Sequence, residues 1–557
     1  MSCLFWLGGL RPILSQVVLD KLCIAGLLYV ANSENNTTVI SFLLLIIVIT
    51  IIIVITVGYS SSDRWTLTFP VLPFVVLQVL RLFLSDDYYL LRISSNLCVL
   101  VAMALCALFP PVQLRPPTGP HNIGVVDVFL PLDNSTKSNA DYKLQQRQES
   151  DHVTARIFYP AASYSSYSTT ASTPYLNPPH FANQLCQSIM KYAAPPPLNK
   201  CGWMLYTWKL IRIPAVTHAP VLQPPPTAHD SNSNSSKGWP CVIHSHGLYG
   251  SPHMYTHQAL ELASHGTVVL MIHHQDGSSP FVMKQDGTTM EYDDTLKQLY
   301  AQGPDMTKYI RTRRAQTHFR VMEFLAAFQS LELLNRGKML IPTLVRHNVS
   351  FEGTLDTSNV TFLGHSFGAA TALTAAAYRP DIPTAVIAHE PAVDWMTDFG
   401  RRALLEESRM KGSMFTYTGG TGGFSDEEGK EQEEELLLSS LSSTTTRTLH
   451  DIPMLILYSD QWAKSGWGGF PLLNCMHQRG EFGPRSSTSC KRSSSSVEVV
   501  SKSHHQEFSD TCALTPLWIG RKTGATGERN PLDTLDEIMG RTLAFFQHDV
   551  RREDVCQ

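Results

Sequence analysis

The chain has 557 residues, of which 43% are hydrophobic and 17% are charged, and its formal net charge is −4. This weakly acidic balance excludes the broad basic field of a nucleic-acid-binding protein, so we expect no nucleic acid partner. Eleven cysteines without a C-x-x-C pair exclude a disulfide scaffold and disfavour a thiolate metal site. The charged fraction lies below the ~25% of average soluble domains, which indicates either a large core or segments in lipid.

The N-terminal part of the chain is dominated by long apolar stretches. Val39 to Val57 contains no charge, glycine or proline, and its length suits a helix that crosses the hydrocarbon of a bilayer. The stretches at 66–84 and 94–109 are weaker candidates for the same structure. We therefore predict two or three transmembrane helices within residues 1–115, a multi-pass membrane localisation, and the membrane as a partner.

Residues 116–557 are predicted to form one α/β domain. Alternating apolar residues indicate hairpin strands at 122–130 and 152–159. Buried strands are indicated at 239–243, 267–272, 359–363, 385–388 and 454–458, and helices at 317–331 and 369–377. Arg311, Arg313 and Arg314 precede the first of these helices and are expected on a solvated face.

Two polar stretches, near 401–448 and 484–499, interrupt this pattern. The first contains an acidic run followed by serines and threonines, and the second is rich in serine. Neither holds enough apolar surface to offset the entropy of ordering, so we predict disordered insertions at both places.

The strongest catalytic motif is Gly364-His365-Ser366-Phe367-Gly368, which has the G-x-S-x-G pattern of a nucleophile elbow. Small residues are needed beside the serine because the preceding strand and the following helix nearly collide there. Both elements are predicted at these places, so we expect an α/β-hydrolase fold, a mostly parallel central sheet flanked by helices, with Ser366 as the nucleophile. The alternative is a tight structural turn whose serine has no catalytic role.

In an α/β hydrolase the acid and the histidine follow the serine along the chain. Glu390 and Asp394 both come after a predicted strand, and either carboxylate can hold an imidazole in the required tautomer. His504 and His505 come after the next predicted strand and are the candidates for the base.

The oxyanion hole needs a second backbone N–H group besides that of Phe367, which follows the serine. The strand predicted at 239–243 leads into His246-Gly247-Leu248, where a donor loop belongs. The N–H groups of Leu248 and Phe367 are therefore the candidate pair.

From Gly119 to the C-terminus the sequence resembles the platelet-activating factor acetylhydrolases of the plasma and intracellular type II family. Several motifs carry this resemblance, and they occur in the family's order and at similar spacing. They are Gly119-Pro120 with Ile123–Leu130, Arg156–Pro160, Ser245–Leu248, Leu262–Gly266, Leu363–Ala370 and His505-Gln506-x-Phe508-x-Asp510.

The resemblance implies a calcium-independent serine esterase that removes a short or oxidised sn-2 acyl chain from a phospholipid substrate, leaving a lysophospholipid. By position it makes Ser366 the nucleophile, His505 the base, and Leu248 and Phe367 the oxyanion amides. The acid departs from the family pattern, in which an aspartate at the strand end is followed closely by Trp-Met. Alignment on the strand favours Glu390, our preferred candidate, whereas alignment on Trp395 favours Asp394.

Other interpretations stay open at this point. Histidines at 244, 246, 265, 273 and 274, with Asp276, are ligand types that zinc sites use. We nevertheless expect no metal and no cofactor, because two of these histidines belong to the hydrolase motifs. Alternative functions are another α/β hydrolase acting on acylglycerols, long-chain phospholipids or polyesters, or a non-catalytic membrane scaffold.

Overall fold

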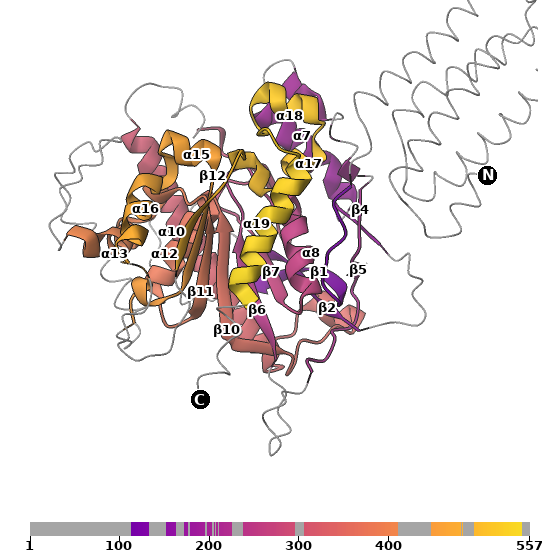
Figure 1. The fold of residues 1–557 in the computed structure, drawn as a ribbon. Helices are drawn as coiled ribbons and strands as arrows, with labels where there is room; N and C mark the ends of the chain where they lie inside the picture. Colours follow the sequence, from indigo (N-terminus) through magenta and orange to yellow (C-terminus); the bar gives the residue numbers. More distant parts are fainter. Residues whose placement is uncertain are drawn as a thin grey trace, which may run out of the picture.

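A central β-sheet organises the part of the chain that the computed structural model describes. Its described residues are 113–132, 152–162, 172–176, 179–194, 198–202, 205, 208–209, 211–225, 238–295, 306–409, 447–480, 482 and 495–547. Within them, nine strands form one sheet in the order β13-β12-β11-β10-β6-β7-β2-β1-β5 (Figure 1).

The strands of this sheet are mostly parallel. β2 runs antiparallel to both of its neighbours, β1 and β7, whereas the successive pairs from β7 to β13 and the pair β1–β5 are parallel. The strands are β1 (Asn122–Pro131), β2 (His152–Ala161), β5 (Val216–Thr217), β6 (Trp239–Ser245), β7 (Val268–His273), β10 (Leu355–His365), β11 (Pro383–His389), β12 (Met454–Ser459) and β13 (Ser496–Val500). The expected α/β fold with a mostly parallel sheet is therefore confirmed, and β1 with β2 forms the expected hairpin pair.

Helices cover both faces of the sheet, because alternate side chains along each strand point to opposite sides. Phe362 packs into a core with α10 and α12, whereas the next residue, Leu363, packs into a core with α8 and α19. In Figure 1, α19 crosses in front of the strands. The helices are α7 (Pro179–Ala193), α8 (Thr256–Ser264), α10 (Thr307–Asn335), α11 (Pro342–His347), α12 (Phe367–Tyr378), α13 (Asp398–Arg409), α15 (Asp460–Ser465), α16 (Phe470–Gln478), α17 (Asp510–Leu514), α18 (Leu517–Thr523) and α19 (Pro531–Phe545).

Short elements fill the connections between these helices and strands. Two two-stranded sheets pair β3 (Thr173–Pro174) with β4 (Arg212–Ile213), and β8 (Phe281–Met283) with β9 (Thr289–Glu291). The 3-10 turns are η2 (Leu198–Lys200), η4 (Pro252–Tyr255), η5 (Val393–Trp395), η6 (Leu449–Asp451), η7 (Trp467–Gly469) and η8 (His505–Phe508).

The prediction of a multi-pass membrane localisation is corrected by the structure. Across the ranges described here, no helix is both long enough and apolar enough to cross a bilayer. The apolar stretches at 39–57, 66–84 and 94–109, and with them almost all of the predicted membrane region 1–115, lie outside the described residues.

The two predicted insertions overlap ordered elements at their edges. α13 continues to Arg409, inside the stretch 401–448, and β13 begins at Ser496, inside the stretch 484–499. β13 pairs in parallel with β12, so the sequence Ser-Val-Glu-Val-Val, which follows the serine-rich run, is ordered at the edge of the sheet. Most of the remaining residues of both insertions lie outside the described ranges.

Candidate active site

The G-x-S-x-G motif forms a sharp turn between β10 and α12, with Ser366 at its tip. Ser366 has φ 57° and ψ −116°, a left-handed conformation that is unfavourable for a residue with a side chain. Two of its backbone hydrogen bonds tie it to the segment after β10 and α12: its N–H donates to His389 O at 2.8 Å, and its carbonyl accepts from Ala392 N at 3.2 Å. The surrounding backbone therefore keeps the serine in this strained position.

The two glycines of the motif are required by close backbone contacts. A Cβ atom on Gly364 would lie 2.2 Å from Gly368 O, and one on Gly368 would lie 1.9 Å from Ser245 O. Either distance is far below van der Waals contact, so any other residue would push the strand and helix apart. The sequence pattern therefore reflects the packing of β10, α12 and β6 around the serine.

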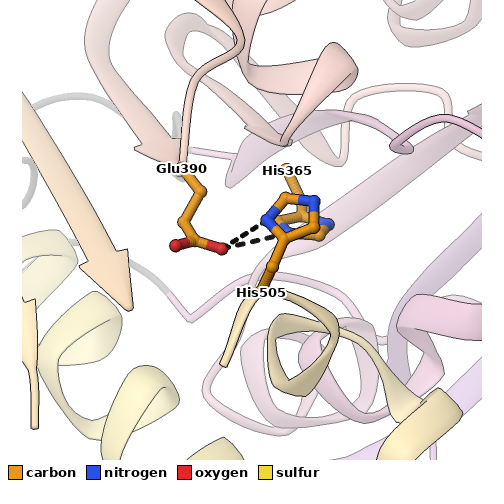
Figure 2. A group of neighbouring side chains, drawn as sticks. All are labelled: His365, Glu390 and His505. Carbon is orange, nitrogen blue, oxygen red and sulfur yellow. Dashed lines mark hydrogen bonds and ion pairs between the residues drawn. The ribbon is translucent and has the colours of Figure 1, made fainter. Parts of the chain in front are cut away.

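Glu390 lies directly after β11 and is completely buried. Its Oε1 accepts hydrogen bonds from the backbone N–H of Ser459, at 2.7 Å, and from the Ser459 hydroxyl. Its Oε2 lies 2.5 Å from His505 Nδ1 and 3.9 Å from His365 Nε2. Figure 2 shows both imidazoles facing one carboxylate oxygen of Glu390.

The charge on Glu390 is set by competition between burial and these partners. Burial raises its pKa, but the charge of His505, the hydrogen bond from His505 and the nearby imidazole of His365 outweigh burial and lower the pKa to about 2. Burial has the opposite effect on His365, whose charged form is a cation, and lowers its pKa to about 4. At neutral pH the site therefore contains a carboxylate and, beside it, a neutral His365.

His505 begins η8, in the loop after β13, and its side chain is 17% exposed. Its backbone N–H donates to Gln461 Oε1 at 3.0 Å. Its ring stacks on the indole of Trp462, with centroids 4.1 Å apart and an angle of 3° between the planes. The backbone, the Nδ1 atom and one face of the ring are thus each held by a different contact.

Asp394, the second candidate acid, lies in η5 and is half-buried. It lines the same pocket as Ser366 and His505, and its backbone carbonyl accepts from Arg314 Nε at 3.3 Å. The Nδ1 atom of His505 is occupied by Glu390. The structure therefore brings Ser366, His505 and Asp394 to one pocket, and Glu390, which does not line that pocket, contacts the histidine.

The pocket beside Ser366 has a volume of about 260 Å³. Aromatic side chains make up much of its wall, together with the loop at Gly247 and the segment around Val393. Its lining residues are Gly247, Leu248, Tyr249, Tyr255, His365, Ser366, Ala392, Val393, Asp394, Trp395, Trp462, Trp467, Gly468, His505 and Gln506.

The predicted oxyanion residues lie on two sides of Ser366. A Cβ atom on Gly247 would be 3.3 Å from the Cβ of Ser366, so the loop that carries Leu248 passes directly beside the serine. Gly247 N–H donates to the Tyr255 hydroxyl at 3.0 Å, which fixes this loop. Phe367 is the first residue of α12, so its N–H has no acceptor within the helix.

A buried network beneath the pocket joins these two sides. Arg320 donates from NH1 to His246 O at 2.8 Å, and its guanidinium lies 4.0 Å from the centre of the Phe367 ring. Its charge is paired with Asp276 through Nε at 2.7 Å. Arg320 thus contacts both the loop before Leu248 and the first residue of α12.

Arg313, on the same helix, is also buried, which contradicts the expected solvated face. It donates to the hydroxyl of Tyr292 at 2.7 Å and to Gln316 Oε1 at 2.8 Å. These partners come from a distant loop and from the next turn of α10, so the presence of three arginines within four residues could not reveal them.

Two of the histidines considered as metal ligands, His246 and His274, take part in hydrogen bonds. His274 Nδ1 lies 2.5 Å from Glu323 Oε2, its Nε2 lies 2.7 Å from Ser245 Oγ, and His246 Nε2 accepts from His274 N at 3.2 Å. Burial lowers the pKa of both His246 and His274 well below the ordinary value. Among the described residues, the three groups whose spacing could hold a cation are His365, Glu390 and His505, with ligand atoms within 4.8 Å of one another.

Sequence reasoning missed Ser459, Gln461 and Trp462, which contact the acid and the base. Ser459 is the last residue of β12 and therefore lies at the sheet edge where Glu390 also lies. The rule that selected Glu390, a polar residue at the end of a parallel strand, could have found Ser459 too. Gln461 and Trp462 had no such signal, because their contacts with His505 depend on where α15 packs in the folded protein.

The fold and the site together define an α/β hydrolase. The sheet is mostly parallel, a serine lies at a strand–helix elbow, and a buried acid later in the chain is bonded to a histidine that follows it. Residues 106–557 match the family described as platelet-activating factor acetylhydrolase, isoform II. The chain belongs to this family.

Individual relatives are more distant. The platelet-activating factor acetylhydrolase of Cavia porcellus is 30% identical over 154 residues, which cover 27% of this chain and 34% of that protein. The protein of the same name from Canis lupus familiaris is 27% identical over 153 residues, with the same coverage. The chain therefore matches about a third of the length of these relatives.

Among solved structures, the chain is similar to a ferulic acid esterase from Streptomyces cinnamoneus. The identity is 15%, the TM-score is 0.44, and the match covers 79% of this chain and 94% of the esterase. A dienelactone hydrolase from Anabaena variabilis matches with 12% identity and a TM-score of 0.28, over 57% of this chain and 88% of that one.

Proposed function

We propose that the chain is a serine esterase that hydrolyses the sn-2 acetyl ester, or another short or oxidised acyl ester, of phospholipids like platelet-activating factor. The products are a lysophospholipid and a carboxylate. Membership of the acetylhydrolase family over residues 106–557 supports this function, and also supports 116–557 as the hydrolase unit. The observation that carries the proposal is the 2.5 Å contact between His505 Nδ1 and Glu390 Oε2 in a pocket that Ser366 also lines.

In the proposed mechanism, Glu390 holds the proton of His505 on Nδ1, which leaves Nε2 free to act as general base. His505 takes the proton of Ser366 while Oγ attacks the sn-2 ester carbonyl. His505 then returns this proton to the departing lysophospholipid oxygen. Water hydrolyses the acyl-enzyme with the same histidine as base, which releases the carboxylate and restores Ser366.

The ionisation of Glu390 supports its proposed role. Its carboxylate stays charged at neutral pH because its pKa is lowered to about 2, in spite of complete burial. A carboxylate beside Nδ1 stabilises the imidazolium that forms when His505 accepts a proton. Asp394 stays the alternative acid in this proposal, since it lines the same pocket.

The tetrahedral intermediate places a negative charge on the former carbonyl oxygen, and we propose that Leu248 N–H and Phe367 N–H stabilise it. The Phe367 amide lies at the start of α12, where the helix dipole adds partial positive charge. Arg320 supports this arrangement because it contacts both His246 and the ring of Phe367.

The size of the pocket supports a short acyl group. Its volume of about 260 Å³ is below the ~300–1,000 Å³ of typical small-molecule pockets, and tryptophans form part of its wall. An acetyl group fits such a space more readily than a long acyl chain.

The test compares hydrolysis of three substrates: a 2-acetyl ether phosphatidylcholine, a long-chain phosphatidylcholine and a triacylglycerol. We expect the acetyl substrate to be hydrolysed fastest, without added calcium, and the Ser366→Ala variant to be inactive on all three. Faster turnover of either long-chain lipid by the wild type would contradict the proposed substrate class. Equal activity of wild type and Ser366→Ala would contradict the proposed site.

A further inference from the structure

The turn from Ser459 to Trp462 contacts both the candidate acid and the candidate base. The Ser459 hydroxyl donates to Glu390 Oε1 and accepts from Trp462 N–H at 3.1 Å. Gln461 Oε1 accepts from the backbone N–H of His505 at 3.0 Å. One turn of chain at the start of α15 thus holds the carboxylate on one side and the histidine backbone on the other.

Trp462 adds a contact with the imidazole itself. Its indole is nearly parallel to the His505 ring, with centroids 4.1 Å apart and planes within 3°. The indole is also held by η7: a Cβ atom on Gly468, which has φ 64°, would lie 2.8 Å from Trp462 Cε3. The tryptophan is therefore wedged between a glycine backbone and the histidine ring.

We propose that Trp462 is a positioning residue for His505: its indole face fixes the plane of the imidazole and stabilises the imidazolium that forms during the reaction. The inference rests on the proposed function in one respect, that Ser366 and His505 act as nucleophile and base.

The two effects have separate physical causes. The Nδ1 bond to Glu390 leaves the ring free to rock about that bond, and a flat contact on one face removes this freedom. A positive ring over an aromatic face is also stabilised by the ring quadrupole, an effect that corresponds to about two- to thirtyfold in rate. The neutral ring gains less from the same contact, so the stabilisation is larger in the transition state than in the resting enzyme.

Other titratable groups also lie near His505 and must be considered in any pH measurement. Glu390 contacts it from the end of β11, and His365 lies with its ring centroid 4.7 Å away at the end of β10. Asp394 lines the same pocket from η5. On α15 itself, Asp460 and Lys464 form an exposed ion pair at 2.6 Å. All of these groups are kept in the variants below.

The test measures kcat, KM and pH dependence for p-nitrophenyl acetate hydrolysis, together with the rate of labelling by a fluorophosphonate probe. Trp462→Met keeps apolar volume without a π face, and Trp462→Phe keeps a smaller face. Trp518→Met is a matched control, because Trp518 is on α18, outside the pocket lining, and 46% exposed.

We expect Trp462→Met to lower kcat and the labelling rate about tenfold, with KM changed less than twofold, and Trp462→Phe to lower them about threefold. The acid limb of kcat/KM should move to lower pH in both, because the protonated ring loses stabilisation. A loss of packing alone would not move the limb in this direction. Trp518→Met should match the wild type in all of these measurements.

Wild-type kcat and an unmoved acid limb in Trp462→Met would overturn the proposal, as would an equal loss in Trp518→Met. If Trp462→Met fails to fold in thermal unfolding, Trp462→Phe decides by the same criteria. Because the probe reports on serine and histidine alone, a wild type that is labelled but leaves the acetyl lipid intact contradicts only the proposed substrate.

Discussion

Glu390 and Asp510 are both completely buried carboxyl groups, yet their pKa values are shifted in opposite directions. Burial raises the pKa of each. For Glu390, the charge of His505, its hydrogen bond and the nearby imidazole of His365 overcome this effect and lower the pKa to about 2. For Asp510, hydrogen bonds from the Tyr175 hydroxyl at 3.1 Å and from His257 N at 3.3 Å do not, and its pKa rises to about 7.

The comparison shows that the partners of a buried acid, more than its depth, decide whether it carries charge. Glu390 is surrounded by donors that favour the anion, which suits a group that supports an imidazolium. For Asp510, the charge of His257 and the hydrogen bonds from the His257 backbone and Tyr175 do not outweigh burial, which suits a group that holds Tyr175 and the chain around His257 together. The proposed catalytic role therefore falls to the buried acid that stays charged.

The largest effect that this difference predicts is on activity. Glu390→Gln should lower kcat about 10³- to 10⁴-fold, because a neutral amide neither fixes the imidazole tautomer nor stabilises its charge. Asp394→Asn should change kcat less than threefold, since Glu390 occupies His505 Nδ1. Steady-state hydrolysis of p-nitrophenyl acetate measures both, and the reverse ranking would make Asp394 the acid.

A smaller loss of kcat is expected when one hydrogen-bond donor to Glu390 is removed. Ser459→Ala deletes the hydroxyl that donates to Glu390 Oε1 and accepts from Trp462 N–H, but it keeps the backbone N–H at 2.7 Å. We expect kcat to fall about fivefold, the equivalent of one ordinary hydrogen bond. Ser465→Ala serves as the control, because Ser465 is the exposed last residue of α15. Equal rates for the two variants would show that Ser459 does not orient the acid.

The smallest effect concerns stability rather than catalysis. The pKa of Asp510 is raised in the folded state from 3.8 to about 7, so its stabilising contribution is full below pH 4 and is lost as the pH rises through 7. Asp510→Asn removes this titration. The melting temperature of the wild type relative to the variant should therefore fall between pH 5 and pH 8.

The control for this pH series is Asp286→Asn, because Asp286 is fully exposed and its pKa is lowered. A lowered pKa confines its effect on stability to acid pH, so its difference from the wild type should stay flat between pH 5 and pH 8. If the difference in melting temperature between the wild type and Asp510→Asn also stays constant from pH 5 to pH 8, the contrast with Glu390 is contradicted.

Much of the framework was predictable from sequence because it follows local rules. Apolar runs gave the strands near 239–243 and 359–363, and the structure has β6 and β10 there. The elbow was predictable because two glycines are required by contacts next to the serine itself. Glu390 was preferred because it ends a parallel strand.

The features that local rules did not give depend on distant packing. Trp462 reaches His505 only because α15 turns back over the histidine, and Arg313 is buried by a tyrosine from another loop. β13 is a short strand directly after a serine-rich stretch, and it pairs with β12. In each case the decisive partner is far away along the chain, where composition and spacing carry no information about it.

The central claim is that Ser366, His505 and Glu390 act as one nucleophilic unit. Intact-mass measurement after treatment with a fluorophosphonate probe tests it most directly, on wild type, Ser366→Ala and Glu390→Gln. We expect one added probe mass on the wild type, none on Ser366→Ala, and labelling of Glu390→Gln at least a hundredfold slower. An unlabelled wild type, or wild-type labelling rates in either variant, would contradict it.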